Sequence, residues 1–464
     1  MGIPFYAKSN DNQGYIKNLE VLAYHNLNGI MAFQMGLHKT EDGRYYLYCG
    51  SYFGAGWSIL EVTDPNNPRF VKYFKFREDA DDYKAQCTFK LQIADGLMIA
   101  SIGKGIQFLH GFDDDAKAIT SLQIFDIKTD PENPKLLSVW DPGQEDDNEG
   151  MGVHRFAYNG GNYVYMPSEC KGYIGFILRI LDISNPCEPK EIGRWWLPEQ
   201  FKDGRMPGTY PVGHQQEKVS PMCHACTLPA DRPGELFMGY FHGGGIILDI
   251  SRPDRPRLKG RIAVTPPFAG KYAGASSHTF LPLTGRNYAV LTNEGERFSV
   301  FSKEMMENGM HKGVMPLNNL HMVDISDPSE PVLIAEFPYP EVPEDFPFPN
   351  FNDCGIGCGG PFGPHNVHEP MGKPFLEDDP NRLYCCYFHA GLRVYDISDP
   401  YIPKEIAYFI PPNPEKQLFG PKFPGPLLGT AEDIVVDDRG VIYMDTYNDG
   451  VFILKLKNDQ NGKK

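Results

Sequence analysis

Histidines occupy one recurring position of this sequence, at the start of a short apolar segment. Four successive repeats carry them there, as His154, His224, His278 and His365. The repeats on either side carry Gln86 and Glu432 at that position, and the first repeat carries Phe33 or Gln34. Neutral imidazoles that converge on one point bind Fe, Zn, Mn, Cu or Ni, and the geometry decides which. We therefore interpret the four histidines as ligands of one metal ion.

A ligating histidine usually donates its second ring N–H to a carboxylate, a backbone carbonyl or water, which fixes the tautomer. The residues that we expect to support the ligands are Gln86, Glu149, Glu169, Glu294 and Glu432. The sequence leaves open which of them supports which histidine. It also leaves an alternative, because a histidine at this position can simply bond to the neighbouring backbone.

Other side chains near the same mouth could act on a substrate. His242 and His389 stand at equivalent turns of two repeats and could move protons or bind substrate. Arg297 could bind a carboxylate through two parallel hydrogen bonds, although an ion pair with a neighbouring glutamate explains it equally well. Phe362 is one of many loop aromatics, which either line an apolar cavity or pack the loops down.

A repeated phrase indicates which elements must position these residues. The phrase Asp182-Ile-Ser-Asn-Pro recurs as Asp249-Ile-Ser-Arg-Pro, Asp324-Ile-Ser-Asp-Pro and Asp396-Ile-Ser-Asp-Pro, with looser copies at 61–68 and 126–134. Each copy follows one apolar strand and precedes another, at a spacing of about 55–75 residues. A period of this size that contains only short strands and turns predicts a β-propeller, whose inner strands line the central axis.

We predict an all-β, seven-bladed propeller that forms a single domain over residues 1–464. The predicted blades cover residues 27–75, 84–142, 150–198, 222–264, 276–338, 363–410 and 430–457. The last blade lacks a fourth strand, and the N-terminal segment 16–25 is expected to supply it. Closing the ring in this way removes exposed sheet edges.

The long extra segments all fall at the end of the blades where the inner strands begin. They are residues 198–222, 265–277, 338–364 and 411–430 between blades, and 104–120 and 297–319 within blades. The turns at the opposite end are short, as at 158–161 and 437–440. A face with many long loops is typical of a binding site, so we expect a walled cavity over the channel. The alternative is that these loops lengthened without a functional role, because exposed loops tolerate insertions.

The sequence Cys223-His-Ala-Cys226 has the spacing of a redox motif but lacks the helix N-terminus that usually stabilises a thiolate. On a regular strand, His224 and Cys226 would share a face and Cys223 would point away. We therefore expect both cysteines to be small packed residues.

The repeat pattern resembles the family of LVIVD-repeat β-propeller proteins over nearly the whole chain. The resemblance implies the fold and leaves the activity open, because propellers host many functions. At the site alone, the four histidines are similar to those of the carotenoid-cleavage oxygenases, which hold Fe(II) with four histidines backed by glutamates. Methanethiol oxidase and the selenium-binding proteins also place histidines from several blades around an axial metal.

Composition and net charge limit the classes of partner and the cellular compartment that we expect for this protein. The net charge of −16 over 464 residues argues against a nucleic-acid or anionic-membrane partner, because phosphate binding needs a basic face. No apolar run is long enough to span a bilayer, and the first residues lack the pattern of a signal peptide. Ten cysteines, including the adjacent pair Cys385-Cys386, do not resemble a disulfide framework. We expect a cytoplasmic protein with a small-molecule substrate, and homo-oligomerisation stays open.

The sequence is compatible with three functions. The favoured one is an Fe(II) oxygenase that cleaves or oxygenates a small, partly aromatic molecule. The second keeps the site but uses Zn or Mn to lower the pKa of a bound water, as in a hydrolase or lyase with His242, His389 or Glu294 as base. The third is a binding or scaffold propeller without chemistry.

Overall fold

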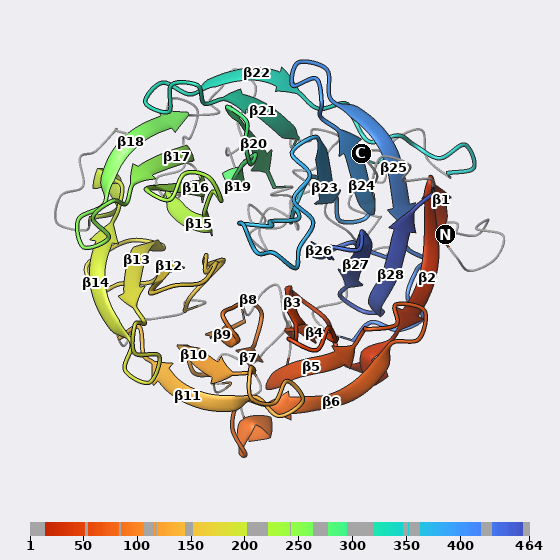
Figure 1. The fold of residues 1–464 in the computed structure, drawn as a ribbon, viewed down its shortest axis with the longest axis horizontal. Coiled ribbons are helices and arrows are strands. Elements are labelled where there is room, and N and C mark those ends of the chain that lie inside the picture. The colour runs from red at the N-terminus through yellow and green to blue at the C-terminus, as the bar shows by residue number, and fades with distance from the viewer. Residues whose placement is uncertain are drawn as a thin grey trace, which may run out of the picture.

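Seven antiparallel sheets stand around a central axis in the computed structural model, which confirms the predicted all-β, seven-bladed propeller (Figure 1). The structure describes residues 14–51, 54–82, 85–105, 116, 118–143, 152–201, 221–241, 243–262, 277–294, 319–346, 351, 362–418 and 429–457. None of the helices in these ranges has the length and apolar character needed to cross a membrane. Cys385 and Cys386 are buried free thiols.

The first three blades follow the chain in order, each numbered from the axis outward. Blade 1 contains β3 (Met35–Lys39), β4 (Tyr45–Cys49), β5 (Gly56–Glu61) and β6 (Arg69–Lys75). Blade 2 contains β7 (Gln86–Cys87), β8 (Leu91–Ala94), β9 (Leu97–Lys104), β10 (Ser121–Asp126) and β11 (Lys135–Trp140). Blade 3 contains β12 (Tyr163–Ser168), β13 (Ile177–Asp182) and β14 (Lys190–Trp195), with isolated bridges at Val153 and Ala157 in place of an inner strand.

The other four blades continue the ring. Blade 4 contains β15 (Met222–Thr227), β16 (Glu235–Phe241), β17 (Gly244–Asp249) and β18 (Arg257–Ile262). Blade 5 contains β19 (Ser277–Pro282), β20 (Tyr288–Asn293), β21 (Leu320–Asp324) and β22 (Val332–Glu336). Blade 6 contains β23 (Arg382–Cys386), β24 (Leu392–Asp396) and β25 (Lys404–Ile410), with an inner bridge at Val367. Blade 7 contains β26 (Ile434–Val436), β27 (Val441–Thr446) and β28 (Gly450–Leu456).

The core consists of apolar layers between neighbouring blades. Leu178 and Ile180 of blade 3, for example, share one buried cluster with Met238 and Ile246 of blade 4. The middle strands are therefore buried on both faces, whereas an outer strand such as β18 is largely exposed. The repeated Asp-Ile-Ser phrase ends each third strand as a turn, and the Asp249 carboxylate accepts the Ser251 N–H at 2.9 Å.

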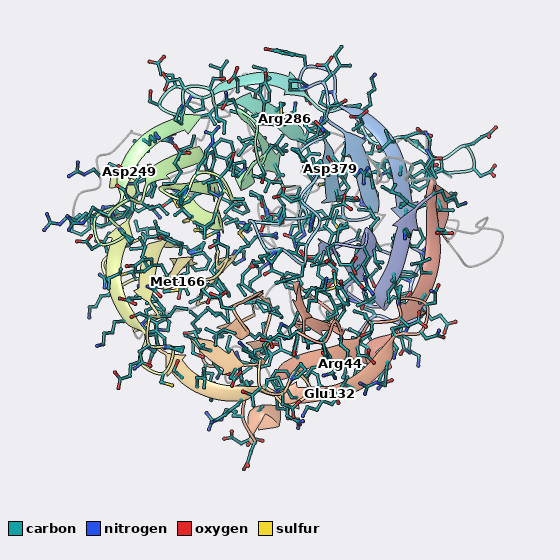
Figure 2. The ribbon with its side chains drawn as sticks, viewed as in Figure 1. Arg44, Glu132, Met166, Asp249, Arg286 and Asp379 are labelled. Atoms are coloured by element: carbon teal, nitrogen blue, oxygen red, sulfur yellow. The ribbon has the colours of Figure 1, made fainter. Side chains whose placement is uncertain are left out.

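Hydrogen bonds between side chains and turns link neighbouring blades. Figure 2 shows Arg44 of blade 1 beside Glu132 of blade 2, and Tyr46 bonds to both. Arg286 of blade 5 donates to the carbonyl of Ile397 in blade 6 at 2.7 Å. These bonds fix the angle between neighbouring blades, and hence the direction in which each inner strand meets the axis.

The N-terminal segment closes the ring in two blades rather than one. β2 (Leu19–His25) pairs with β28 and completes blade 7, as predicted. β1 (Tyr15–Lys17) instead pairs with β25 and adds a fourth strand to blade 6, so the prediction of one strand over 16–25 is wrong at its start. Between the two, Asn18 adopts a left-handed conformation with φ of 53°, which asparagine tolerates better than most residues and which redirects the chain.

Blade 6 departs from the expectation of short turns on the face opposite the histidines. Residues 369–380, which we call the plug, cross the centre of the ring as the sky-blue loop in Figure 1. Their hydrogen bonds reach three other blades: Asn159 Nδ2 to Met371 O (3.2 Å), Lys373 Nζ to Gln92 Oε1 (2.5 Å) and Asp438 N to Phe375 O (3.1 Å). The cavity between the plug and the inner strands measures about 40 Å³, which is room for a few waters.

Candidate metal centre

The four predicted histidines come from the inner segments of blades 3 to 6. His224 and His278 lie in β15 and β19, and each is the unpaired residue at the point where the register of its strand shifts. His154 and His365 precede β12 and β23, and their N–H groups donate to Pro167 O at 2.9 Å and Cys386 O at 2.7 Å. All four side chains are buried, with at most 6% of the residue surface exposed.

The four imidazole rings lie next to one another in blade order. The distance between ring centroids is 4.2 Å from His154 to His224, 4.1 Å from His224 to His278 and 4.8 Å from His278 to His365. Imidazoles bound at right angles through metal–nitrogen bonds of about 2.1 Å would place their centroids about 4.6 Å apart. The spacing is therefore close to that of neighbouring ligands on one ion.

Hydrogen bonds to Nδ1 fix the tautomer of two of the rings. His154 Nδ1 lies 3.0 Å from His224 O, and His365 Nδ1 lies 2.8 Å from Glu432 O. A carbonyl oxygen only accepts, so both Nδ1 atoms carry the hydrogen and both Nε2 atoms keep a lone pair. His278 Nδ1 bonds to Thr279 Oγ1 at 2.7 Å, and its buried Nε2 has no hydrogen-bond partner in the described parts of the chain. Backbone and hydroxyl partners of this kind are those that ligating histidines use.

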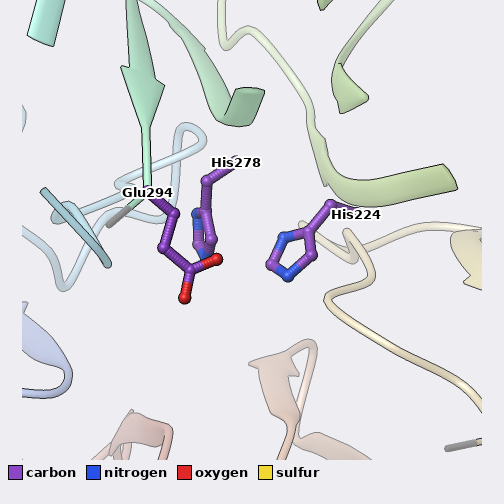
Figure 3. Close-up of side chains that lie close together, drawn as sticks. All are labelled: His224, His278 and Glu294. Atoms are coloured by element: carbon purple, nitrogen blue, oxygen red, sulfur yellow. The ribbon is translucent and has the colours of Figure 1, made fainter. Parts of the chain in front are cut away.

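Glu294, expected to support a ligand from outside, lies among the donor atoms themselves. It follows β20, and one donor atom from each of His224, His278 and Glu294 lies within 4.8 Å of the other two (Figure 3). Its Oε1 is also 3.8 Å from His365 Nε2. Two histidines and one carboxylate on one face are the donor set of non-haem Fe(II) oxygenases. The described residues thus contain a group of three that could hold a metal ion.

Burial sets the charges of the site. It lowers the pKa of each of the four histidines well below the ordinary value, so the rings are neutral and their lone pairs are available at neutral pH. Burial also raises the pKa of Glu294 to about 7, although the Lys90 and Arg155 charges oppose the shift. A divalent cation would favour the ionised carboxylate.

Phenylalanines stack behind three of the rings, which the sequence analysis did not anticipate. Phe241 stacks on His224 with 4.1 Å between centroids and 10° between planes, and Phe388 stacks on His365 at 4.5 Å and 25°. Phe176 takes the same place behind His154 at 5.6 Å. The signal was present, because Tyr240-Phe-His recurs as Tyr387-Phe-His in an equivalent turn.

A β-bulge places His224 and overturns the expected alternation of β15. The pairing of β15 with β16 shifts register between Cys223 and Ala225, so His224 is the extra residue. Cys223 and Cys226, predicted to point to opposite faces, lie in the same buried apolar cluster, and burial raises the pKa of Cys226. A regular period of two fails here because the bulge inserts one residue.

Two of the expected supporting residues have definite partners. Gln86 donates to the carbonyls of Gly103 (2.8 Å) and Ile119 (2.9 Å) and accepts from Ile119 N at 2.9 Å, so it ties blade 2 together. Glu432 is fully buried, its Oε1 lies 3.2 Å from His365 Nδ1, and burial raises its pKa well above the ordinary value. Glu169 follows β12, and its backbone carbonyl accepts a hydrogen bond from Arg179.

The structure describes two of the residues predicted to bind substrate, His389 and Phe362. His389 is fully buried, with its Nε2 3.2 Å from Phe351 O. Phe362 stacks on Phe351 at 5.8 Å, lies 5.7 Å from the His389 ring and forms a β-bridge with Phe388, which stacks on His365. His242, Arg297 and Glu149 lie outside the described residues.

The sequence did not lead us to predict two buried basic residues near the axis, Lys90 and Arg155. Lys90, between β7 and β8, is 1% exposed, and its ammonium lies 4.3 Å from the centroid of Phe33. Arg155 follows His154 and lies 3.2 Å from Glu369 of the plug. The sequence signal for Lys90 is a charged residue inside an otherwise apolar inner segment.

Comparison with known proteins identifies the repeat. The sequence model of the LVIVD repeat matches residues 160–195, the three strands of blade 3, and residues 316–337, the last two strands of blade 5. The chain carries LVIVD repeats. None of the curated proteins matches this LVIVD-repeat propeller in sequence.

Solved structures resemble the LVIVD-repeat propeller in fold at low identity. A periplasmic gluconolactonase of Pseudomonas aeruginosa aligns with a TM-score of 0.51 at 9% identity, over 91% of this chain and 99% of its own. Sqt1 of Saccharomyces cerevisiae aligns with 0.50 at 8% identity, over 94% and 98%. A streptogramin B lyase aligns with 0.47 at 10% identity, over 94% and 97%. Likeness at this level of identity concerns the fold alone.

Proposed function

We propose that this LVIVD-repeat propeller is a metalloenzyme with one metal ion at the mouth of its channel, acting on a small molecule. The ligands would be His154, His224, His278 and His365, joined by Glu294. One observation carries the proposal: four buried neutral imidazoles stand side by side, and two of them have Nδ1 committed to a backbone carbonyl. The donor atoms of His224, His278 and Glu294, which lie within 4.8 Å of one another, support the proposal further.

The donor set favours Fe(II) over the other candidates. Imidazole nitrogens suit Fe, Zn, Cu and Ni, and a carboxylate beside two histidines is the arrangement of Fe(II) oxygenases. An Fe(II) ion would supply dioxygen chemistry, and we propose oxidative cleavage or oxygenation of a small, partly aromatic molecule. Zn or Mn in the same site would instead activate water for a hydrolase or lyase. The metal therefore decides the reaction class.

The two ends of the channel would have different roles. The inner segment of blade 6 runs from His365 into the plug, so the histidines and the plug lie at opposite ends of it. The cavity on the plug side measures about 40 Å³ and is lined by residues of the plug and the inner strands. We therefore propose that substrate enters from the histidine end. A cytoplasmic location is consistent with the adjacent buried thiols Cys385 and Cys386, since thiols persist in reducing compartments.

Elemental analysis of the protein purified without added metal tests the proposal. We expect near-stoichiometric iron in the wild type, its loss in His224→Ala, and oxygen uptake only by the iron-containing protein. His38→Ala is the matched control, because His38 is also buried but lies in β3 of blade 1, away from the histidine group. Zinc or manganese lost in the same variant would favour the hydrolase or lyase. No metal in the wild type, even after anaerobic incubation with Fe(II), would leave a binding propeller.

A further inference from the structure

Three blades face the four histidines across the channel axis. Blade 7 contributes Glu432, blade 1 contributes Phe33, and blade 2 contributes Gln86 and Lys90. Gln86 already has backbone partners for both its amide oxygen and its nitrogen. A molecule bound to a metal ion on the histidine side would therefore extend toward Phe33 and Lys90.

Lys90 is a buried basic residue whose ammonium forms no ion pair with the residues that the structure describes. Its backbone is fixed by the bond from Ser101 N to Lys90 O at 2.8 Å, and its ammonium lies over the Phe33 ring at 4.3 Å. Within the described ranges, the ammonium makes no hydrogen bond and no ion pair. Burying an ammonium in this way is costly unless an anion joins it, and a single aromatic face offsets only part of that cost.

Lys90 lies in the inner segment of blade 2, as the four histidines lie in the inner segments of blades 3 to 6. Its positive charge is among the causes that lower the pKa of all four rings, and Glu432, Asp433 and Glu294 in turn raise the pKa of Lys90. Arg155 also acts on Lys90 through its positive charge, and its Nε and Nη1 are buried without hydrogen-bond partners in the described residues.

We propose that Lys90 binds the carboxylate of the substrate while the body of the substrate lies against Phe33, so that the substrate is a small monocarboxylic acid with a planar apolar body. The inference deepens the proposed function and rests on it. A carboxylate fits a single ammonium, whereas a phosphate usually recruits several donors or a helix N-terminus.

Calorimetric titration of the full-length, metal-loaded protein with benzoate tests this inference, with benzamide as the neutral probe of the same shape. We expect the wild type to bind benzoate more tightly than benzamide. In Lys90→Met, benzoate binding should weaken by about 30-fold or more, because the lost partner is a buried charge. Benzamide binding and metal content should not change.

Two further variants keep the test decisive. Lys373→Met removes another buried lysine, whose ammonium bonds to Gln92 on the plug side, and it should leave benzoate binding unchanged. Phe33→Leu should weaken both probes while preserving the preference for benzoate. Equal benzoate affinity in wild type and Lys90→Met, or metal loss in Lys90→Met, would overturn the inference. Absence of metal from the wild type would instead count against the proposed function.

Discussion

Single atoms decide whether the histidine group can act as a metal centre. Each ring has two nitrogens, and a structure that occupies Nδ1 directs Nε2 toward the ion. His154 and His365 achieve this through backbone carbonyls, which no side-chain substitution removes. His278 differs, because its Nδ1 depends on the side chain of Thr279. The orientation of the His278 ring can therefore be tested by a substitution that leaves the proposed metal ligands unchanged.

Replacing Thr279 by valine should lower metal affinity by about tenfold while leaving the fold intact. The substitution removes the hydroxyl bonded to His278 Nδ1 at 2.7 Å and keeps a branched side chain of similar size. Loss of an outer hydrogen bond to a ligating histidine typically costs about 10–100-fold in metal affinity. Competition with a metal buffer measures the effect.

Thr227→Val is the control for that experiment. Thr227 is equally buried, in β15, and its hydroxyl has no hydrogen-bond partner among the described residues. Its substitution should leave metal affinity unchanged. Identical affinities in both variants would mean that Thr279 does not orient the ring.

At the scale of elements, close packing between inner strands fixes where each histidine stands. A Cβ atom at Gly239 of β16 would lie only 2.1 Å from the carbonyl oxygen of His278 in β19. Gly239 is paired with Ala225 of β15 and with Gly245 of β17, so its backbone cannot yield without moving β16. The glycine is therefore part of how blade 4 positions the histidine of blade 5.

Gly239→Ala should destabilise the protein by about 1–3 kcal/mol, as overpacking in a core usually does. It should also weaken metal binding, because the displaced atom belongs to His278. Gly234→Ala is the matched control, since no atom lies within 4 Å of a Cβ built there. Thermal unfolding and metal content measured on both variants check the prediction. An unchanged melting temperature in Gly239→Ala would contradict it.

The plug is held by a histidine that must stay neutral. His368 Nδ1 accepts the Val436 N–H at 3.2 Å, and its Nε2–H donates to Glu377 O at 2.8 Å. Burial lowers the pKa of His368 to about 4, against about 6.5 in an unfolded chain. Between these values the unfolded chain binds a proton that the folded protein excludes. The contribution of His368 to stability is therefore complete above pH 6.5 and is lost as the pH falls.

We expect His368→Gln to reduce the acid sensitivity of folding. The wild type should lose about 2 kcal/mol more than the variant between pH 7 and pH 5, from this one group. Chemical unfolding of metal-free protein at both pH values gives the difference. The same loss in wild type and variant would mean that His368 titrates normally and does not anchor the plug.

At the scale of the whole molecule, stability depends on closure of the ring. β2 covers the edge of blade 7 and β1 covers the edge of blade 6, so one short N-terminal stretch protects two sheets. An uncovered edge presents unpaired N–H and C=O groups that invite pairing with another chain. Each strand also covers apolar side chains of the blade that it completes.

Two truncations separate the contributions of these strands. Removal of residues 1–18 takes away β1 and should lower the melting temperature moderately. Removal of residues 1–26 takes away both strands and should cause severe destabilisation with self-association. Thermal unfolding and size-exclusion chromatography of the two proteins test this order. Equal stability of the two truncated proteins would contradict the role given to β2.

The sequence by itself determined the blades, their order and the shared position of the four histidines. It did so because the Asp-Ile-Ser turn repeats with the blades and lets unlike segments be aligned. Tertiary structure alone decided that Glu294 joins the donor atoms, that Lys90 and Arg155 stand near the axis, and that the plug closes the far end. Such contacts join segments from different blades, and their distances depend on how the blades pack and where a bulge or a long turn redirects the chain. A local repeat specifies the position of a residue within its strand. Only the closed ring specifies which residues of other blades that side chain faces across the axis.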